Sequence, residues 1–64
     1  MIGYVAKDKD GEVYLHIKEP AYDDNWKNWL SNRDQYCITG LFPELDDMSY
    51  TDKPIKVEIK LEKV

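Results

Sequence analysis

Two stretches near the N-terminus have the pattern of strands: Ile2 to Lys7 combines apolar and polar residues, and in Glu12 to Lys18 the two kinds alternate. In an extended chain, the apolar residues of the second stretch share one face: Val13, Leu15 and Ile17. The residues between them form a mainly polar face: Tyr14, His16 and Lys18. Asp8 to Gly11 separates the two stretches, and Asp at the start with Gly at the end is typical of a tight turn. The pattern predicts a β-hairpin.

The C-terminal segment alternates more strictly than any other. Its apolar residues occupy every second position: Ile55, Val57, Ile59 and Leu61. Charged residues lie between them: Lys56, Glu58, Lys60 and Glu62. This predicts a strand with one core face and one solvated face, opened by Pro54. At a sheet edge such a strand can pair with another copy or another protein, although charged side chains also protect edges from pairing.

The middle of the chain has a different period. Its large apolar side chains recur at helical spacing: Tyr22, Trp26, Trp29 and Leu30. Asp23 or Asp24 suits the N-terminal cap and Arg33 the C-terminal end of a helix. We therefore expect a short amphipathic helix over Asp23 to Asn32. Because the asparagines in this range are poor helix formers, an irregular loop pinned by the two tryptophans is the alternative.

The segment that follows contains three short pieces. Gln35 to Thr39 is expected to form a third strand, closed by Gly40. Leu41 to Leu45 has the pattern of an apolar anchor with a tight turn at Pro43, and Asp46 to Lys53 is acidic and expected to be exposed. The fold class is therefore α+β, mainly β. We expect a single domain, 1–64, with a small antiparallel sheet of three or four strands, an N-terminal β-hairpin and one short helix or aromatic loop.

Composition favours binding over catalysis. The chain has 64 residues and 42% of them are hydrophobic, so it can build a small core but seldom a deep catalytic cleft as well. Its net charge of −4 disfavours phosphate backbones and anionic membranes. A single cysteine rules out an internal disulfide, and the N-terminus has no signal-peptide pattern. We expect a cytoplasmic protein without a membrane partner.

No residue pattern indicates a metal, a cofactor or a catalytic group. An EF-hand loop with Gly11 at its sixth position would place Ala6 and Ile17 where carboxylates are required, so we interpret Asp8 to Gly11 as a turn. His16 and Cys37 are too few for zinc and lack the groups that would orient a nucleophile. We expect Cys37 to be a buried thiol in a strand and His16 to lie on a polar face.

The two tryptophans allow two interpretations. Trp26 and Trp29 can form a stacking platform for single-stranded nucleic acid, which normally accompanies a basic groove. Lys56 and Lys60, however, share a face with glutamates. The favoured interpretation is that both tryptophans belong to the core of a very small domain.

Acidic residues provide the candidate partner-binding surface. They comprise Glu44, Asp46, Asp47 and Asp52, together with Asp23 and Asp24. With Tyr22 and Tyr50, these side chains suit a protein partner that has a basic or nucleic-acid-binding surface. The simpler interpretation is a solvated loop that maintains solubility. A homodimer is a further candidate, and direct binding to nucleic acid is not expected.

Several segments resemble, in order, very small bacteriophage and prophage proteins. They are Tyr4–Gly11 (YxAxDKDG), Val13–Leu15, Lys18–Pro20, Trp26 or Trp29, Phe42–Glu44 (FPE) and Pro54–Ile59 (PxKVEI). The resemblance implies a stoichiometric accessory protein that covers a working surface of a host protein, as inhibitors of CRISPR nucleases and other defences do. The alternatives are a single-stranded nucleic-acid-binding module and a self-assembling element built through the last strand.

Overall fold

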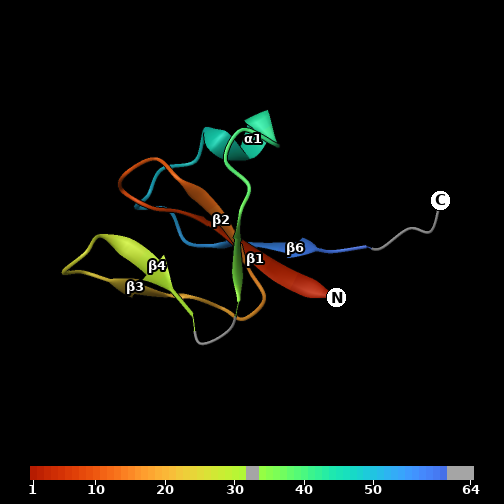
Figure 1. Cartoon of the computed structure of the whole chain (residues 1–64), viewed down its shortest axis with the longest axis horizontal. Coiled ribbons are helices and arrows are strands. Elements are labelled where there is room, and N and C mark those ends of the chain that lie inside the picture. Colours follow the sequence, from red (N-terminus) through yellow and green to blue (C-terminus); the bar gives the residue numbers. More distant parts are fainter. Residues whose placement is uncertain (32–33, 61–64) are drawn as a thin grey trace.

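The computed structural model describes residues 1–31 and 34–60. Within these ranges the chain forms a four-stranded antiparallel sheet with strand order β5-β2-β1-β6, a separate two-stranded sheet of β3 and β4, and a one-turn helix, α1 (Figure 1). The mainly β architecture agrees with the sequence-based prediction. The molecule measures 42 × 25 × 15 Å, so its shortest dimension leaves room for little more than one sheet and a thin cover.

The predicted N-terminal hairpin is confirmed. Strand β1 (Ile2–Lys7) pairs antiparallel with β2 (Val13–His16). The backbone N–H of Gly11 donates to the carbonyl of Asp8 at 3.0 Å, and Gly11 has a φ of 95°, which glycine adopts without strain. The Asp10 carboxylate accepts from the N–H of Glu12 at 2.9 Å. The turn residues thus satisfy the turn's own backbone, as the sequence predicts.

Two further strands flank this hairpin. Strand β6 (Ile55–Glu58) pairs antiparallel with β1, and β5 (Gln35–Cys37) pairs antiparallel with β2. Both were predicted as strands, and both form edges of the sheet. The predicted continuation of the last strand to Leu61 and Glu62 lies outside the described residues.

The predicted helix in the middle of the chain is wrong. Strands β3 (Ala21–Asp23) and β4 (Asn28–Leu30) form a second hairpin instead. The Asp23 carboxylate does cap backbone groups, but it accepts from the N–H of Asn25 at 2.9 Å and of Trp26 at 3.2 Å to form a turn. Asn32 and Arg33, which the predicted helix included, lie outside the described residues.

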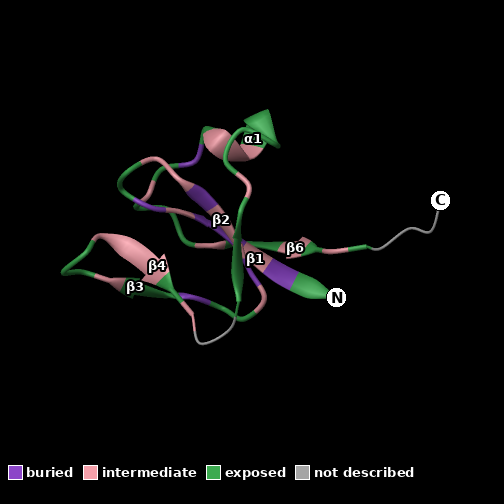
Figure 2. Cartoon of the chain, viewed as in Figure 1, coloured by how far each residue is buried: buried purple, intermediate pink, exposed green. Residues whose placement is uncertain are grey.

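A small core covers one face of the four-stranded sheet. It contains Val5, Val13 and Met48, and the partly buried residues packed against it are Leu15, Ile38, Leu45 and Val57. Buried residues gather in and around β1 and β2 (Figure 2). Helix α1 (Pro43–Asp46) starts at a proline, as expected near a tight turn. Of the predicted apolar anchor, Leu45 reaches the core, whereas Leu41 and Phe42 are exposed.

The opposite face of the sheet is also covered, which the sequence did not indicate. Ala6 and His16 are both fully buried there, so the prediction that His16 lies on a polar surface is wrong. Strand β4 contacts β1, and Ser31, which follows β4, places its Oγ 3.2 Å from His16 Nδ1. The second hairpin therefore converts an apparently polar strand face into a partly internal one.

Candidate functional site

The second hairpin presents a cross-strand pair of aromatic side chains. Tyr22 in β3 lies directly opposite Trp29 in β4, and their rings meet edge to face with centroids 5.1 Å apart. This arrangement aligns the positive edge of one ring with the negative face of the other. The pair holds two large side chains in a fixed orientation on a sheet of only two strands.

Three hydrogen bonds fix this hairpin to the rest of the chain. The Trp29 Nε1–H donates to the Tyr50 carbonyl at 3.2 Å, which joins the hairpin to the loop after α1. The Trp29 backbone N–H donates to the Asp8 carboxylate at 2.8 Å. The Lys9 N–H donates to the Lys27 carbonyl at 3.0 Å, so the turns of the two hairpins lie against each other. The aromatic pair therefore has a rigid support despite its exposed position.

A shallow hollow of about 430 Å³ lies beside the aromatic pair. Its lining, which we call the hairpin hollow, consists of Tyr22, Asp24, Lys27, Trp29, Tyr50 and Thr51. Asp24 and Lys27 form an ion pair at 2.9 Å across its rim, and their side chains are 87% and 42% exposed. Aromatic walls with a charged rim give the hollow both contact area and polar groups that orient a ligand.

Trp26 projects from the turn between β3 and β4 and is 77% exposed. The prediction that both tryptophans belong to the core is therefore wrong for Trp26, while Trp29 is half-buried. The reason is the turn itself. Because residues 24–27 form the loop of a hairpin, the Trp26 side chain has no neighbouring element to pack against, and helical spacing does not apply.

The structure brings together only part of the predicted partner-binding set. Tyr22 and Tyr50 share the hairpin hollow with Asp24. The four predicted acidic residues in and after α1, Glu44, Asp46, Asp47 and Asp52, are not among its lining residues. They form a separate acidic segment.

Within that segment, the acidic residues have different roles. Asp46 is half-buried, and its carboxylate accepts from the Gly40 N–H at 3.2 Å. The Asp52 carboxylate accepts from the Ser49 N–H at 2.8 Å, so both residues also hold local backbone. Glu44 and Asp47 are exposed and therefore remain the better candidates for contact with a partner.

The residues considered for metal binding and catalysis are dispersed. Asp8 is 8% exposed and bonded to Trp29, and burial raises the pKa of its carboxyl. His16 lies against Ser31, and burial lowers the pKa of its imidazole. Cys37 is exposed, not buried as predicted, because β5 is an edge strand, and its Sγ lies 3.3 Å from the Glu12 carboxylate. Within residues 1–31 and 34–60, no group of three or more His, Cys, Asp or Glu is placed to hold a metal ion.

A second hollow lies on the apolar face of the four-stranded sheet. It has a volume of about 350 Å³, and we call it the sheet groove. Its apolar lining comes from the sheet and from the segment around α1: Val5, Leu15, Ile38, Phe42, Leu45, Val57 and Ile59. Glu58 and Lys60 line its end. The small α1 helix therefore leaves part of the core face open beside β6.

Sequence reasoning considered Trp26 as part of a stacking platform but did not place it, with Lys27, in the turn of a second hairpin. The available signal was the cluster of Asp and Asn residues between Asp23 and Asn28, which favours a turn over a helix interior. Because that turn closes a hairpin, Tyr22 and Trp29 lie opposite each other on its two strands, and Trp26 lies in the turn between them.

Comparison with known protein families, with curated proteins and with solved structures finds no match to this chain. Within the part of the chain that the structure describes, no helix is long and apolar enough to cross a membrane.

Proposed function

We propose that this chain is a non-enzymatic accessory protein of a bacteriophage or mobile element that binds a host protein and inhibits or modulates it. The proposed partner has a basic or nucleic-acid-binding surface in the host cytoplasm, as a CRISPR or other defence nuclease has. The assignment to phage proteins and to this class of target derives from the sequence resemblance. The exposure of Trp26 and the hollow beside it support the second hairpin as the binding surface.

Trp26 is the observation that carries the proposal. A tryptophan side chain that is 77% exposed contributes little burial to the fold, whereas tryptophan and tyrosine are enriched among residues that dominate protein–protein affinity. Tyr22 and Tyr50 line the hollow beside the same hairpin. The hydrogen bonds of Trp29 hold the hairpin in place, so binding requires little ordering of the backbone. Trp26 would act as the anchor that enters a pocket of the partner.

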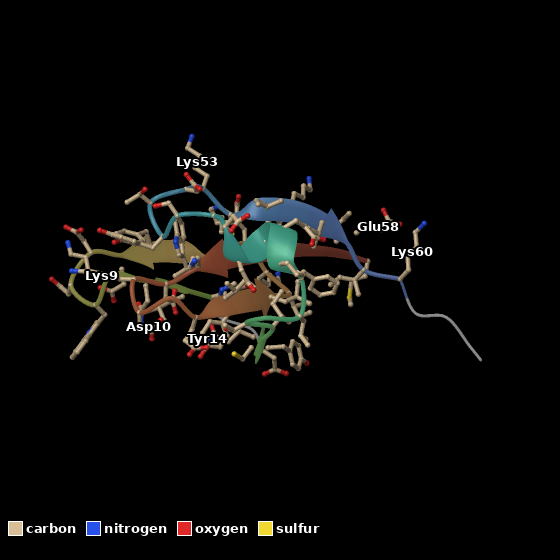
Figure 3. The ribbon with its side chains drawn as sticks, turned by 90° about the horizontal axis from the view of Figure 1, so that it is seen from above. Lys9, Asp10, Tyr14, Lys53, Glu58 and Lys60 are labelled. Atoms are coloured by element: carbon tan, nitrogen blue, oxygen red, sulfur yellow. The ribbon has the colours of Figure 1, made fainter. Side chains whose placement is uncertain are left out.

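Charge defines the kind of partner. Asp24 lies at the rim of the hairpin hollow with its side chain 87% exposed. Asp10, in the adjoining turn, lies close to Lys9 at the same end of the molecule (Figure 3). Glu44 and Asp47 add exposed negative charge elsewhere, and the net charge of the chain is −4. The excess of negative charge on the chain favours rapid and specific association with a basic protein surface.

The exposure of Trp26 also favours a second candidate, the single-stranded nucleic-acid-binding module. An exposed indole can stack on a base. The carboxylates of Asp23 and Asp24 adjoin the same turn, however, and they repel a phosphate backbone. The protein-binding function is therefore the better supported of the two.

An affinity capture from bacterial lysate tests the proposal, with and without nuclease treatment. The baits are the wild type, Trp26→Ala and the matched control Tyr36→Ala, which removes an exposed aromatic from β5. We expect the wild type to capture one stoichiometric protein whether or not nuclease is added. The Tyr36→Ala control should capture the same protein. Removal of Trp26 should weaken that complex by about 2 kcal/mol or more.

Charge reversal at the two freely exposed acids, Glu44→Lys and Asp47→Lys, should mainly slow association and reduce its dependence on salt. Capture that disappears after nuclease treatment would instead support the nucleic-acid module. A specific protein complex that is indifferent to Trp26→Ala would show that the hairpin is not the binding surface.

A further inference from the structure

Among residues 1–31 and 34–60, no strand pairs with the outer edge of β6. Ile59 and Met1 exchange two backbone hydrogen bonds, at 2.6 and 3.2 Å, at the end of the β1–β6 ladder. Because hydrogen-bonded and non-hydrogen-bonded pairs alternate in an antiparallel ladder, Val57 and Ile55 also direct their N–H and C=O groups toward β1. Lys56 and Glu58 must therefore direct theirs outward. Figure 3 shows β6 as the outermost strand, with no other ribbon beyond that edge.

The side chains of β6 alternate in a self-complementary way. If a second copy of β6 pairs antiparallel with Val57 opposite Val57, then Lys56 of each copy lies opposite Glu58 of the other. The same register places Ile55 opposite Ile59. Lys56 of one copy and Glu58 of the other then exchange backbone hydrogen bonds. These are the residues whose N–H and C=O groups point away from β1, so the backbone pairing fits the free edge of β6. Charge, apolar contact and backbone pairing are satisfied together.

The two nearest registers that also use the outward backbone groups of Lys56 and Glu58 are less favourable. A register centred on Lys56 places lysine against lysine, and one centred on Glu58 places glutamate against glutamate. Pro54 lies opposite Lys60 in the Val57-centred register, where the missing N–H of Pro54 ends the ladder. The charged residues of β6 therefore favour the Val57-centred register over the registers centred on Lys56 and Glu58, whereas uniform charge would only block pairing.

The apolar side of the chain supports the same arrangement. Ile55 is 40% exposed, and Val57 and Ile59 line the open sheet groove. Pairing across β6 joins the grooves of two copies on the same face of one continuous sheet. Only four hydrophobic residues are buried in the described part of the chain: Val5, Ala6, Val13 and Met48. A core this small gains stability from association with a second copy.

We propose that two copies of the chain form a closed two-fold dimer through β6, with Val57 on the symmetry axis and reciprocal Lys56–Glu58 pairs beside it. The four-stranded sheets join into one continuous antiparallel sheet. The turn that holds Lys9 and Asp10 lies at the opposite end of the molecule from Glu58 and Lys60 (Figure 3). Each copy therefore keeps its hairpin hollow free, and the dimer presents two such hollows.

Sedimentation equilibrium of the full chain, from micromolar to millimolar concentration, tests the dimer with a charge-swap series. The variants are Lys56→Glu, Glu58→Lys and the double variant with both changes. We expect each single variant to dimerise about tenfold to a hundredfold more weakly than the wild type, because two attractive pairs become repulsive. The double variant has the net charge of the wild type and restores the reciprocal pairs, so it should dimerise like the wild type. Both side chains are exposed, so the changes should leave the fold intact, and circular dichroism of each variant tests this.

Amide hydrogen exchange identifies the edge independently. The N–H groups of Lys56 and Glu58 should become protected as concentration rises, whereas the N–H of Val57, which faces β1, should be protected throughout. Protection that appears at Gln35 and Cys37 instead would place the contact at β5 and overturn the proposal. A wild type that stays monomeric to millimolar concentration, or a double variant that stays as weak as the single ones, would also overturn it.

Discussion

The carboxylate of Asp8 accepts a hydrogen bond from the backbone N–H of Trp29 at 2.8 Å, which links the turn of the first hairpin to a strand of the second. The two residues are separated by 21 positions in the sequence. Asp8 is only 8% exposed, and burial raises the pKa of its carboxyl. A residue that appears to be an ordinary turn former thus also positions the hairpin that carries Trp26.

Asp8→Ala should destabilise the protein by about 1–3 kcal/mol, because it leaves the Trp29 N–H without its acceptor in a partly buried place. Asp8→Asn should cost less, since the amide oxygen accepts the same bond and no charge is buried. Urea denaturation at neutral pH, followed by circular dichroism, measures both. Equal losses from the two variants would show that the charge of Asp8, and not its acceptor oxygen, holds the hairpin.

Gly3 is required by the side chains that close over it. A Cβ at this position would lie 2.6 Å from Ile59 Cδ1, 3.0 Å from Leu15 Cδ1 and 3.3 Å from the carbonyl of His16. Gly3→Ala should therefore destabilise the fold by about 1–3 kcal/mol through overpacking.

The matched double variant isolates this contact. Ile59→Val deletes Cδ1, so it should reduce the cost of Gly3→Ala when the two changes are combined. Thermal and urea unfolding of both single variants and the double variant provide the cycle. Strict additivity of the two changes would mean that Ile59 does not restrict position 3.

The parts of the fold that follow from local pattern were predictable. β2 and β6 alternate with period two, β1 is a short, mainly apolar run bounded by a turn, and Asp8 to Gly11 encodes that turn through its own side-chain and glycine chemistry. Those signals act within a few residues, so the sequence contains them explicitly. The unpaired edge of β6 was likewise considered as a pairing surface, although its register needed the hydrogen-bond parity that only the structure provides.

The remaining features depend on contacts between distant residues. Tyr22, Trp26 and Trp29 have helical spacing, yet the Asx turn at Asp23 closes a hairpin, which reverses the direction of the chain and exposes Trp26. His16 is polar and was expected at the surface, but Ser31 and the second hairpin cover it. Of the predicted site, Tyr22 and Tyr50 line the same hollow, where Trp29 donates a hydrogen bond to the Tyr50 carbonyl. No pattern within a few residues of the sequence predicts these long-range contacts.

Lys27 is the only non-glycine residue with positive φ among the described positions, at 56°. Most side chains are disfavoured in this conformation, whereas glycine adopts it freely. Lys27→Gly should therefore unfold at a higher temperature than Lys27→Ala. Both changes remove the exposed ion pair with Asp24 equally, so their difference reports the backbone alone. An alanine variant as stable as the glycine variant would show that position 27 is not strained.

The buried imidazole of His16 should make stability depend on pH. Its side chain is fully buried, its Nε2 makes no hydrogen bond to any described residue, and burial lowers its pKa below the ordinary value of 6.5. The unfolded chain therefore binds a proton more readily than the folded one. The stability that His16 contributes is complete above pH 6.5 and is lost as the pH falls from 6.5 toward the folded-state pKa, with a slope of at most about 1.4 kcal/mol per pH unit.

Asp8 should oppose this trend at lower pH. Its folded-state pKa is raised above 3.8, so the folded chain is the better proton acceptor at Asp8, and that contribution to stability is lost as the pH rises from 3.8 through the raised value. Urea titrations at a series of pH values from neutral to acid separate the two groups. The stability change from His16 begins at pH 6.5 and extends downward, whereas that from Asp8 begins at pH 3.8 and extends upward. In His16→Asn, which keeps a polar group near Ser31 without titrating, the fall below pH 6.5 should disappear even if overall stability is lower. If the variant still loses stability below pH 6.5, other groups cause that loss, and the folded protein accommodates a charged His16.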